Sequence, residues 1–392
     1  MQLNTPSYLD LCWDTMDHDK REQMTLESAK QTALFAKRSV PFYKHHFQNI
    51  SESTINNITT LSQFAFEVPE TTKLHLSNNH YRSFLPECRF HDERDIHKGA
   101  YRNKSTGGTT SSPVTVIYTA QDWRAMAQHI ARSIKFDFKD RLNELENFIV
   151  CGLYHGDHVT NEIYQAGMNL LGMDFFNRVS TKQNDTKSNF KFIQRTKPNG
   201  ILAPPEDSTE KQTKGITLDK ILQMDAVNAK KHSYRFNQKI NTEFKAIFWS
   251  SMPMSMELYD YLKNHLGIPY IQGQYGSTEI CPTGATCCEH PTGFHLGYGP
   301  ALVLTCSEQR QQLAEEGEMG YLLVTKCGAT DEKGENYVPS GTTLINFRTG
   351  DSAKLVQQQG QVCGCGRNTP VLVDLERTQY REAKSNFGCQ VD

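Results

Sequence analysis

The stretch at residues 105–113, with the sequence STGGTTSSP, places hydroxyl side chains on both sides of two adjacent glycines. Glycine lets backbone N–H groups turn toward a ligand, and hydroxyls add further donors, so such a loop can bind a phosphate. The β-prone run VTVIY at residues 114–118 follows directly, and a polar hairpin turn that leads into a strand would have the same composition. On these residues alone, a phosphate loop and a hairpin turn are equal alternatives.

Two motifs further along the chain carry side chains that would complement such a loop. They are QYGSTE at residues 274–279 and RTGD at residues 348–351. An anion-binding loop, one carboxylate for a divalent cation and one carboxylate for a diol would together suffice to hold Mg-ATP. Each motif alone is also typical of a strand end or a tight turn, so the indication comes from their combination.

Most of the cysteines lie late in the chain. Their number, 11, is odd, and the N-terminal residues show no secretion signal, which disfavours a disulfide framework. Cys288 and His295 lie close together on one segment and Cys363 and Cys365 on another, and three cysteines with one histidine form a closed tetrahedral zinc set. We predict a structural zinc at these four residues. Cys287 in place of Cys288, or reduced buried thiols without metal, are the alternatives.

Charge and hydropathy exclude several classes of partner. The 392 residues include 42 Lys and Arg against 44 Asp and Glu, which gives a net charge of -2 and favours neither nucleic acid nor a charged membrane surface. No apolar run reaches the roughly 18 residues that a membrane-spanning helix needs. We therefore expect a soluble, cytoplasmic protein that binds neither nucleic acid nor membrane.

The elements that would position the motifs alternate along the chain. Helical periodicity predicts helices at residues 18–37, 120–138, 163–171, 218–226 and 256–266, with short helices and irregular connections at 50–79. Apolar, β-prone runs predict strands at residues 114–118, 148–154, 200–205 and 244–249. Such alternation is typical of an α/β fold. Downstream, shorter runs predict a small, mainly β subdomain with strands at residues 302–305, 321–325 and 343–347.

In order and spacing, these motifs resemble those of adenylate-forming enzymes of the acyl- and aryl-CoA ligase superfamily, and most of all those of phenylacetate-CoA ligases. The resemblance runs over nearly the whole chain. Beyond the three motifs above, it includes VPFY at 40–43, SMP at 251–253, LGIP at 266–269, GFHL at 293–296 and CGCGR at 363–367. It implies an α/β adenylation domain at residues 1–376, made of two packed α/β subdomains plus the small β subdomain at about 297–376.

The resemblance also implies a role for each matching residue. Glu279 would bind magnesium near the α-phosphate and act in catalysis with Thr109 and Thr110, and Asp351 would accept hydrogen bonds from the ribose hydroxyls. Residues 106–110 would bind the β- and γ-phosphates, and residues 251–253 and 274–275 would flank adenine. The other nucleotide-binding positions that it implies are Thr106, Gly107, Gly108, Ser251, Met252, Pro253, Gln274, Tyr275, Gly276, Ser277 and Thr278.

The expected substrate contacts are Tyr154, His155 and Gly276. Gly276 would leave room where the acid carboxylate meets the α-phosphate. Tyr154 and His155 follow a predicted strand at the position where the family builds the wall of its acyl or aryl pocket. Hydrogen bonding to substrate is the interpretation preferred here over a metal site with Asp157 and His158, and an ordinary polar loop is the alternative.

Two departures from the family pattern bear on these roles. Ser111 and Ser112 stand where the family loop usually has glycine and lysine, so we expect weaker ATP binding. After the family's hinge position near Arg377, the family continues into a C-terminal lid domain with a catalytic lysine, whereas here residues 377–392 form a short tail in which Lys384 is the only lysine. Such an ending is similar to that of the adenylating protein of phenazine (griseoluteate) biosynthesis and of the bioluminescence acyl-protein synthetases, and implies a lid domain that is absent and a role in secondary-metabolite biosynthesis.

The resemblance therefore implies an adenylate-forming ligase. It would activate a carboxylic acid, with an aromatic acid preferred, to its acyl-adenylate with ATP and Mg²⁺, and release pyrophosphate. The acyl group would pass to coenzyme A, a carrier protein or a separate acceptor enzyme. One alternative is a non-catalytic binder or carrier of an aryl acid or acyl-adenylate, and another is an acyl-protein synthetase-like subunit with Cys389 as acyl acceptor. The oligomeric state, a homodimer included, stays open.

Overall fold

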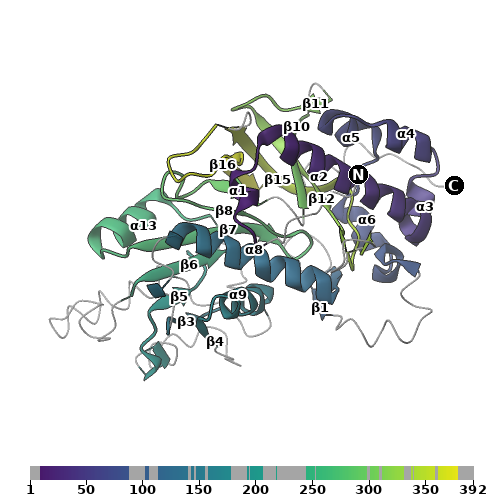
Figure 1. The fold of residues 1–392 in the computed structure, drawn as a ribbon. Coiled ribbons are helices and arrows are strands. Elements are labelled where there is room, and N and C mark those ends of the chain that lie inside the picture. Colours follow the sequence, from purple (N-terminus) through teal and green to yellow (C-terminus); the bar gives the residue numbers. More distant parts are fainter. Residues whose placement is uncertain are drawn as a thin grey trace.

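A long mixed sheet forms the centre of the molecule, with helices on its faces (Figure 1). Within the described residues this sheet has 12 strands in the order β11-β10-β12-β15-β16-β9-β8-β7-β6-β5-β3-β4. The expected α/β fold class is therefore confirmed. The computed structural model describes residues 9–87, 102–105, 114–139, 143–144, 147–154, 158–177, 192–193, 195–205, 218, 244–251, 253–297, 301–308, 311–330, 337–338, 340–357 and 361–377.

One half of the sheet is parallel, as the alternation in the sequence predicts. Strand β6 is buried along its whole length, since helices cover both faces of a parallel sheet. The neighbouring pairs β4-β3, β3-β5, β5-β6 and β6-β7 are all parallel. The strands of this half are β3 (Ile149–Gly152), β4 (Asp174–Asn177), β5 (Gly200–Leu202), β6 (Ala246–Ser250) and β7 (Tyr270–Ser277).

Helices α8 (Ala120–Phe138), α9 (Val159–Asn169) and α13 (Met256–Asp260) belong to this half. Helix α8 has the bounds that the sequence predicts, because a capping box of Thr119 and Asp122 starts it and Phe138 ends its apolar face. Helix α13 is shorter than expected, since the backbone changes to a single π turn at Tyr261–His265. Of the predicted helix at 218–226, only Leu218 lies in the described residues.

The other half of the sheet is antiparallel. The expected β-rich region forms, but its strands continue the same sheet through β9 and β16. The prediction of a strand at 343–347 is wrong, because the strand begins only at Phe347: Asn346 has a φ of +43°, and its amide donates to the carbonyls of Phe64 and Val68. The strands here are β8 (Cys281–Ala285), β9 (Phe294–Leu296), β10 (Ala301–Ser307), β11 (Gln312–Leu313), β12 (Met319–Lys326), β15 (Phe347–Val356) and β16 (Val371–Arg377).

Short helices from the N-terminal part of the chain gather beside β10, β11, β12 and β15 (Figure 1). Tyr43 fastens them to the sheet: its buried hydroxyl bonds to Thr71 Oγ1 and accepts from the backbone N–H of Ile345. The predicted helix at 18–37 is confirmed as α2. The group comprises the longer helix α2 (His18–Ser39) and the short elements α3 (Pro41–His46), α4 (Glu52–Asn57), α5 (Leu61–Glu67), α6 (Lys73–Asn78) and the 3-10 turn Tyr81–Phe84. Helix α1 (Cys12–Thr15) lies against α8 instead, where Asp14 pairs with Arg132.

Two small hairpins complete the described structure. Strands β1 (Arg102–Ser105) and β2 (Thr115–Tyr118) pair antiparallel, and so do β13 (Ala329–Thr330) and β14 (Tyr337–Val338). Asp122 joins the start of α8 to the segment that follows β14, since its carboxylate caps α8 and accepts from Ser340 Oγ and the N–H of Gly341. Among the helices described, none combines the length and apolar character needed to cross a membrane.

Candidate functional site

The structure brings the second and third motifs together at the end of β7. Tyr275 lies on β7 and Asp351 on β15, and the Tyr275 hydroxyl donates to Asp351 Oδ2 over 2.9 Å. Burial raises the pKa of Asp351, while the hydrogen bond from Tyr275 and the charge of Arg377 oppose this rise. A carboxylate in this position can accept hydrogen bonds from a diol, and the Tyr275 ring beside it offers a flat surface for a base.

Glu279 lies in the turn that joins β7 to β8. Its side chain is 6% exposed and accepts a hydrogen bond from Ser277 Oγ over 2.7 Å. Lys73 Nζ from the N-terminal helix α6 lies 3.7 Å from Glu279 Oε1. The backbone brings this lysine in, because Thr71 forms a parallel bridge with Phe347 at the start of β15. Sequence reasoning missed Lys73, since nothing near it in the chain signals a partner on β7.

Of the first motif, only Ser105 lies in the described residues. Ser105 and Thr115 are paired residues of the hairpin, so the two ends of the loop at 106–114 lie side by side. The phosphate-binding positions Thr106, Gly107, Gly108, Thr109 and Thr110 lie outside the described residues. The hairpin reaches the second motif directly, because the Tyr118 hydroxyl donates to the carbonyl of Thr278.

Gly276 has a structural reason to be glycine that the sequence did not indicate. A Cβ atom at this position would lie 2.3 Å from the carbonyl oxygen of Cys281 and 2.8 Å from Cα of Pro282. The register of β7 against β8 shifts between Tyr275 and Gly276, and Cys281 has a φ of +67°. The close approach of the two strands therefore already requires a glycine here.

Of the expected substrate contacts, Tyr154 follows β3 and contacts the end of β6. The buried Tyr154 hydroxyl donates to the carbonyl of Ser250 over 2.5 Å and accepts from its N–H over 3.0 Å, so Tyr154 anchors the end of β6. The next residue, Ser251, has a φ of +75°, a strained backbone of the kind found at ligand sites. Pro253 follows on the surface, whereas His155, Asp157 and Met252 lie outside the described residues.

The side chain of Gln274 lies on the opposite face of the sheet from that of Tyr275, since successive residues of a strand face opposite sides of a sheet. Its amide donates to Ser133 Oγ over 2.9 Å, and its oxygen lies 3.1 Å from Nε2 of His129, both on α8. Gln274 therefore holds β7 to α8, and only its backbone remains for a base on the Tyr275 face.

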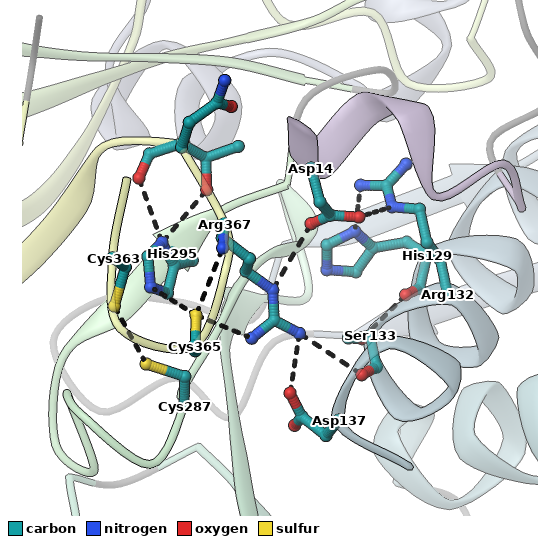
Figure 2. Close-up of polar contacts among 12 residues, drawn as sticks. Asp14, His129, Arg132, Ser133, Asp137, Cys287, His295, Cys363, Cys365 and Arg367 are labelled. Carbon is teal, nitrogen blue, oxygen red and sulfur yellow. Dashed lines mark hydrogen bonds and ion pairs between the residues drawn. The ribbon is translucent and has the colours of Figure 1, made fainter. Parts of the chain in front are cut away.

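Four potential metal ligands converge beyond the C-terminal end of β8, on β9 and in the turn before β16. The ligand atoms of Cys287, His295, Cys363 and Cys365 all lie within 4.8 Å of one another (Figure 2). Cys288 does not belong to this group, because it is exposed and its thiol lies beside Glu289. The alternative of Cys287 in its place is the one that the structure supports.

The protonation of these ligands suits a metal ion. His295 Nδ1 lies 3.0 Å from the carbonyl oxygen of Thr369, which can only accept, so Nδ1 carries the proton and Nε2 faces Cys365 with its lone pair. Hydrogen bonds from Cys287 and the Arg367 backbone lower the pKa of Cys365. Three sulfur atoms and one imidazole nitrogen make a donor set that fits tetrahedral zinc, in a closed site with no position for substrate.

Arg367 connects this Cys/His site to α8 (Figure 2). Its guanidinium is 1% exposed and pairs with Asp137 over 2.9 Å and Asp14 over 3.5 Å, and Asp14 also pairs with Arg132. Sequence reasoning included Arg367 in the CGCGR motif but gave it no role. Its partners come from distant segments, so no local pattern could have revealed them.

Comparison with known proteins agrees with this fold. No model of a known protein family matches the chain, and no curated protein sequence matches it. Among solved structures, it is similar to 2-hydroxyisobutyryl-CoA ligase in an open conformation with 2-HIB-AMP and CoA, with a TM-score of 0.70, 16% identity, and coverage of 95% of this chain and 78% of that chain. The same ligase in its thioesterification state gives a TM-score of 0.69, 16% identity, and coverage of 97% and 72%. The chain thus has the fold of an acyl-CoA ligase.

Proposed function

We propose that this protein activates a carboxylic acid with Mg-ATP, forming an acyl-adenylate and pyrophosphate. The observation that carries this proposal is the arrangement of Glu279, Tyr275 and Asp351 around the end of β7. These three residues offer a carboxylate for a cation, a ring for a base and a carboxylate for a ribose. The ligase of the same fold holds 2-HIB-AMP, which is itself an acyl-adenylate.

In the proposed reaction, an oxygen of the acid carboxylate attacks the α-phosphorus of ATP. The new bond joins that oxygen to phosphorus, and the bond from phosphorus to the oxygen bridging to the β-phosphate breaks, so that pyrophosphate leaves with the electron pair. No protein nucleophile and no proton transfer are required. Catalysis then rests on in-line positioning of the two reactants and on neutralisation of phosphate charge.

Each part of Mg-ATP would be bound by different residues. Asp351 holds the ribose hydroxyls and Tyr275 lies against adenine, while Ser251 and Pro253 close the other side of the base. Glu279 binds Mg²⁺, which supplies positive charge to the phosphates when bound. The loop at 106–110 supplies N–H and hydroxyl donors to the β- and γ-phosphates, with Thr109 and Thr110 nearest to the leaving pyrophosphate.

The proposed acid is aromatic. Supporting this are the resemblance to phenylacetate-CoA ligases and the stacked rings of Tyr154 and His158, whose centroids lie 4.8 Å apart at the end of β3. Tyr154, His155 and Gly276 would line the acid site. The acyl group would then pass to coenzyme A, which the ligase of the same fold binds, or to a carrier protein or acceptor enzyme.

The Cys/His site is proposed to hold structural zinc. Cys287, His295, Cys363 and Cys365 supply a closed set of ligands, in which Cys287 follows β8, His295 lies on β9 and the two others precede β16. Zinc there would fasten the turn before β16 to β9. Metal analysis of purified protein should give about one equivalent of zinc, and far less than that, with the fold retained, would contradict the assignment.

Acid-dependent exchange of labelled pyrophosphate into ATP tests the proposed reaction. Exchange should require Mg²⁺ and one member of a panel of aryl and aliphatic acids, because the adenylation step is reversible. Nucleotide binding without exchange for any acid would instead favour a non-catalytic binder of an acid or acyl-adenylate. An exchange reaction supported only by long-chain fatty acids would overturn the aromatic preference while leaving adenylation in place.

A further inference from the structure

We propose that Arg367 couples the Cys/His metal site to the nucleotide strand β7, so that metal occupancy and nucleotide binding are energetically linked. The inference rests on the proposed function, since it takes the end of β7 as the nucleotide site. Arg367 acts here as a positioning residue that touches neither substrate nor nucleotide. Three consecutive sets of contacts, all among described residues, join the two sites, and Figure 2 shows Arg367 between Cys365 and the α8 residues Ser133 and Asp137.

The first set joins Arg367 to a metal ligand. Its backbone N–H donates to Cys365 Sγ over 3.5 Å, and Nη1 lies 4.0 Å from the same sulfur. Three thiolates around a divalent cation leave a net negative charge, which a buried guanidinium balances. Partners of this kind orient a metal ligand and change metal affinity by roughly 10–100-fold when removed.

The second set joins the same guanidinium to α8. Nη2 donates to Asp137 Oδ1 over 2.9 Å and reaches the carbonyl oxygen of Ser133 at 3.4 Å. The guanidinium carbon lies 4.2 Å from the centre of the Phe136 ring. Arg367 therefore contacts one side of the last turns of α8 through a charge, a carbonyl and a ring.

The third set joins those turns of α8 to β7. Ser133 Oγ accepts from the Gln274 amide, and Asp137 accepts from the Gln272 amide, so the residues next to Arg367 also hold two side chains of the strand. Gln274 also contacts His129 on the preceding turn of α8. One residue beyond Gln274 is Tyr275, which donates to Asp351.

The residues that form these contacts between Arg367 and β7 are buried. Gln272 and Gln274 are 4% and 2% exposed, and Arg367 is 1% exposed, so water cannot replace a contact that is lost. Removing one member of a buried charged network is costly, because it leaves its partners without compensation. Without a metal to fix Cys365, the contacts of Arg367 with this sulfur are no longer held in place, and the other partners of Arg367 are the α8 residues that contact β7.

Linkage gives the test, since two coupled sites must affect each other by the same factor. We measure the affinity of AMP by calorimetry for the zinc-loaded protein and for the protein after chelation, with circular dichroism to verify its fold. AMP should bind roughly 5-fold or more weakly without zinc, and saturating AMP should raise zinc affinity, measured against a chromophoric chelator, by the same factor. Equal AMP affinity in both states would overturn the coupling.

Three variants separate this coupling from general destabilisation. Ser133→Ala should leave zinc affinity without AMP within about 2-fold and lower the coupling factor, because it removes the contact with Gln274 without touching a charge, while the contact of Asp137 with Gln272 remains. Arg367→Met should lower zinc affinity by roughly 10-fold or more and also abolish the coupling. Arg21→Met is the matched control: Arg21 is equally buried and bonds to Asn368 in the same turn and to the carbonyl of Met16, which lie on neither α8 nor β7, so the coupling factor should persist.

A spectroscopic measurement covers the case in which the chelated protein or the Arg367 variant fails to fold. In the Co²⁺-substituted protein, AMP should shift the sulfur-to-cobalt absorption bands of the wild type more than those of Ser133→Ala. An identical shift in both proteins would overturn the role of this path. Failure of AMP to bind the folded, zinc-loaded wild type would contradict the proposed function itself, whereas AMP binding without a band shift would contradict only the coupling.

Discussion

Lys73 Nζ lies 3.7 Å from Glu279 Oε1, although the two residues come from opposite parts of the chain. The contact depends on the pairing of Thr71 with the start of β15, where the N–H of Thr71 donates to the carbonyl of Asn346 and the N–H of Arg348 donates to the carbonyl of Thr71. The N-terminal helices are therefore part of the candidate site, because they supply the cation that neutralises its most buried carboxylate.

Replacing Lys73 with Met should lower the free energy of unfolding by about 1–3 kcal/mol, since it leaves the carboxylate of Glu279 buried without a cation. The Lys73 side chain is 20% exposed and that of Glu279 6%, so water compensates little. Urea denaturation of Lys73→Met, Glu279→Gln and the double variant gives the interaction energy. Additivity within about 0.5 kcal/mol would show that the pair contributes nothing.

Asp351→Asn should weaken ATP binding by roughly 10-fold, because an amide accepts hydrogen bonds from the ribose less strongly than a carboxylate. The wild type should discriminate against 2′,3′-dideoxy-ATP by a similar factor, and the variant should not. Asp374→Asn on β16 is the control, since this carboxylate pairs with Lys354 away from Tyr275. Equal discrimination by wild type and Asp351→Asn would exclude the ribose role.

Cys287→Ser and Cys288→Ser form a matched pair of adjacent substitutions. Cys287→Ser should weaken zinc binding by more than about 10-fold, because it removes a ligand of the buried set. Cys288→Ser should keep the metal, since this thiol is exposed. Zinc content and thermal stability of the two variants test this prediction. Loss of zinc from Cys288→Ser, with zinc retained in Cys287→Ser, would show that Cys288 is the ligand.

Acid should destabilise the protein partly through His129. Burial and the charge of Arg132 lower the pKa of His129 from 6.5 to about 3. Below pH 6.5 the unfolded chain binds a proton that the folded protein does not, so stability falls as the pH falls from about 6.5 to about 3. Between pH 7 and pH 5 this contributes about 2 kcal/mol. His129→Gln should lose less stability over that interval by about this amount in urea denaturation, and an identical loss would contradict it.

Much of the fold was predictable where local signals agree with tertiary packing. Helix α8 matches its predicted bounds because its capping box and apolar face indicate the same span, and the buried strand β6 is apolar throughout. The extent of the sheet was not predictable, since pairing of β9 with β16 joins segments far apart in the chain. The start of β15 was predicted too early, because the Asn346 side chain donates to the carbonyl of Phe64 on α5, a contact that no local pattern indicates.

The candidate site, like the fold, was only partly predictable from the sequence. The sequence placed Tyr275, Glu279 and Asp351 in motifs, and the structure brings them together. It could not choose between the adjacent cysteines 287 and 288, because only the folded backbone decides which thiol faces inward. Nor could it assign Lys73 or Arg367, whose partners lie on other elements. The phosphate-binding role expected of the loop at 106–113 stays a prediction, since this loop lies outside the described residues.

Transfer of ¹⁸O from a labelled acid to AMP tests the proposed adenylation most directly. With an acid that supports pyrophosphate exchange, labelled in its carboxylate, and with hydroxylamine as acceptor, the attacking oxygen should remain on phosphorus when the acyl group leaves. We therefore expect AMP that carries one ¹⁸O atom, with no label in phosphate or pyrophosphate, and loss of this product in Glu279→Gln. Unlabelled AMP, or label in inorganic phosphate with ADP as the nucleotide product, would contradict acyl-adenylate formation.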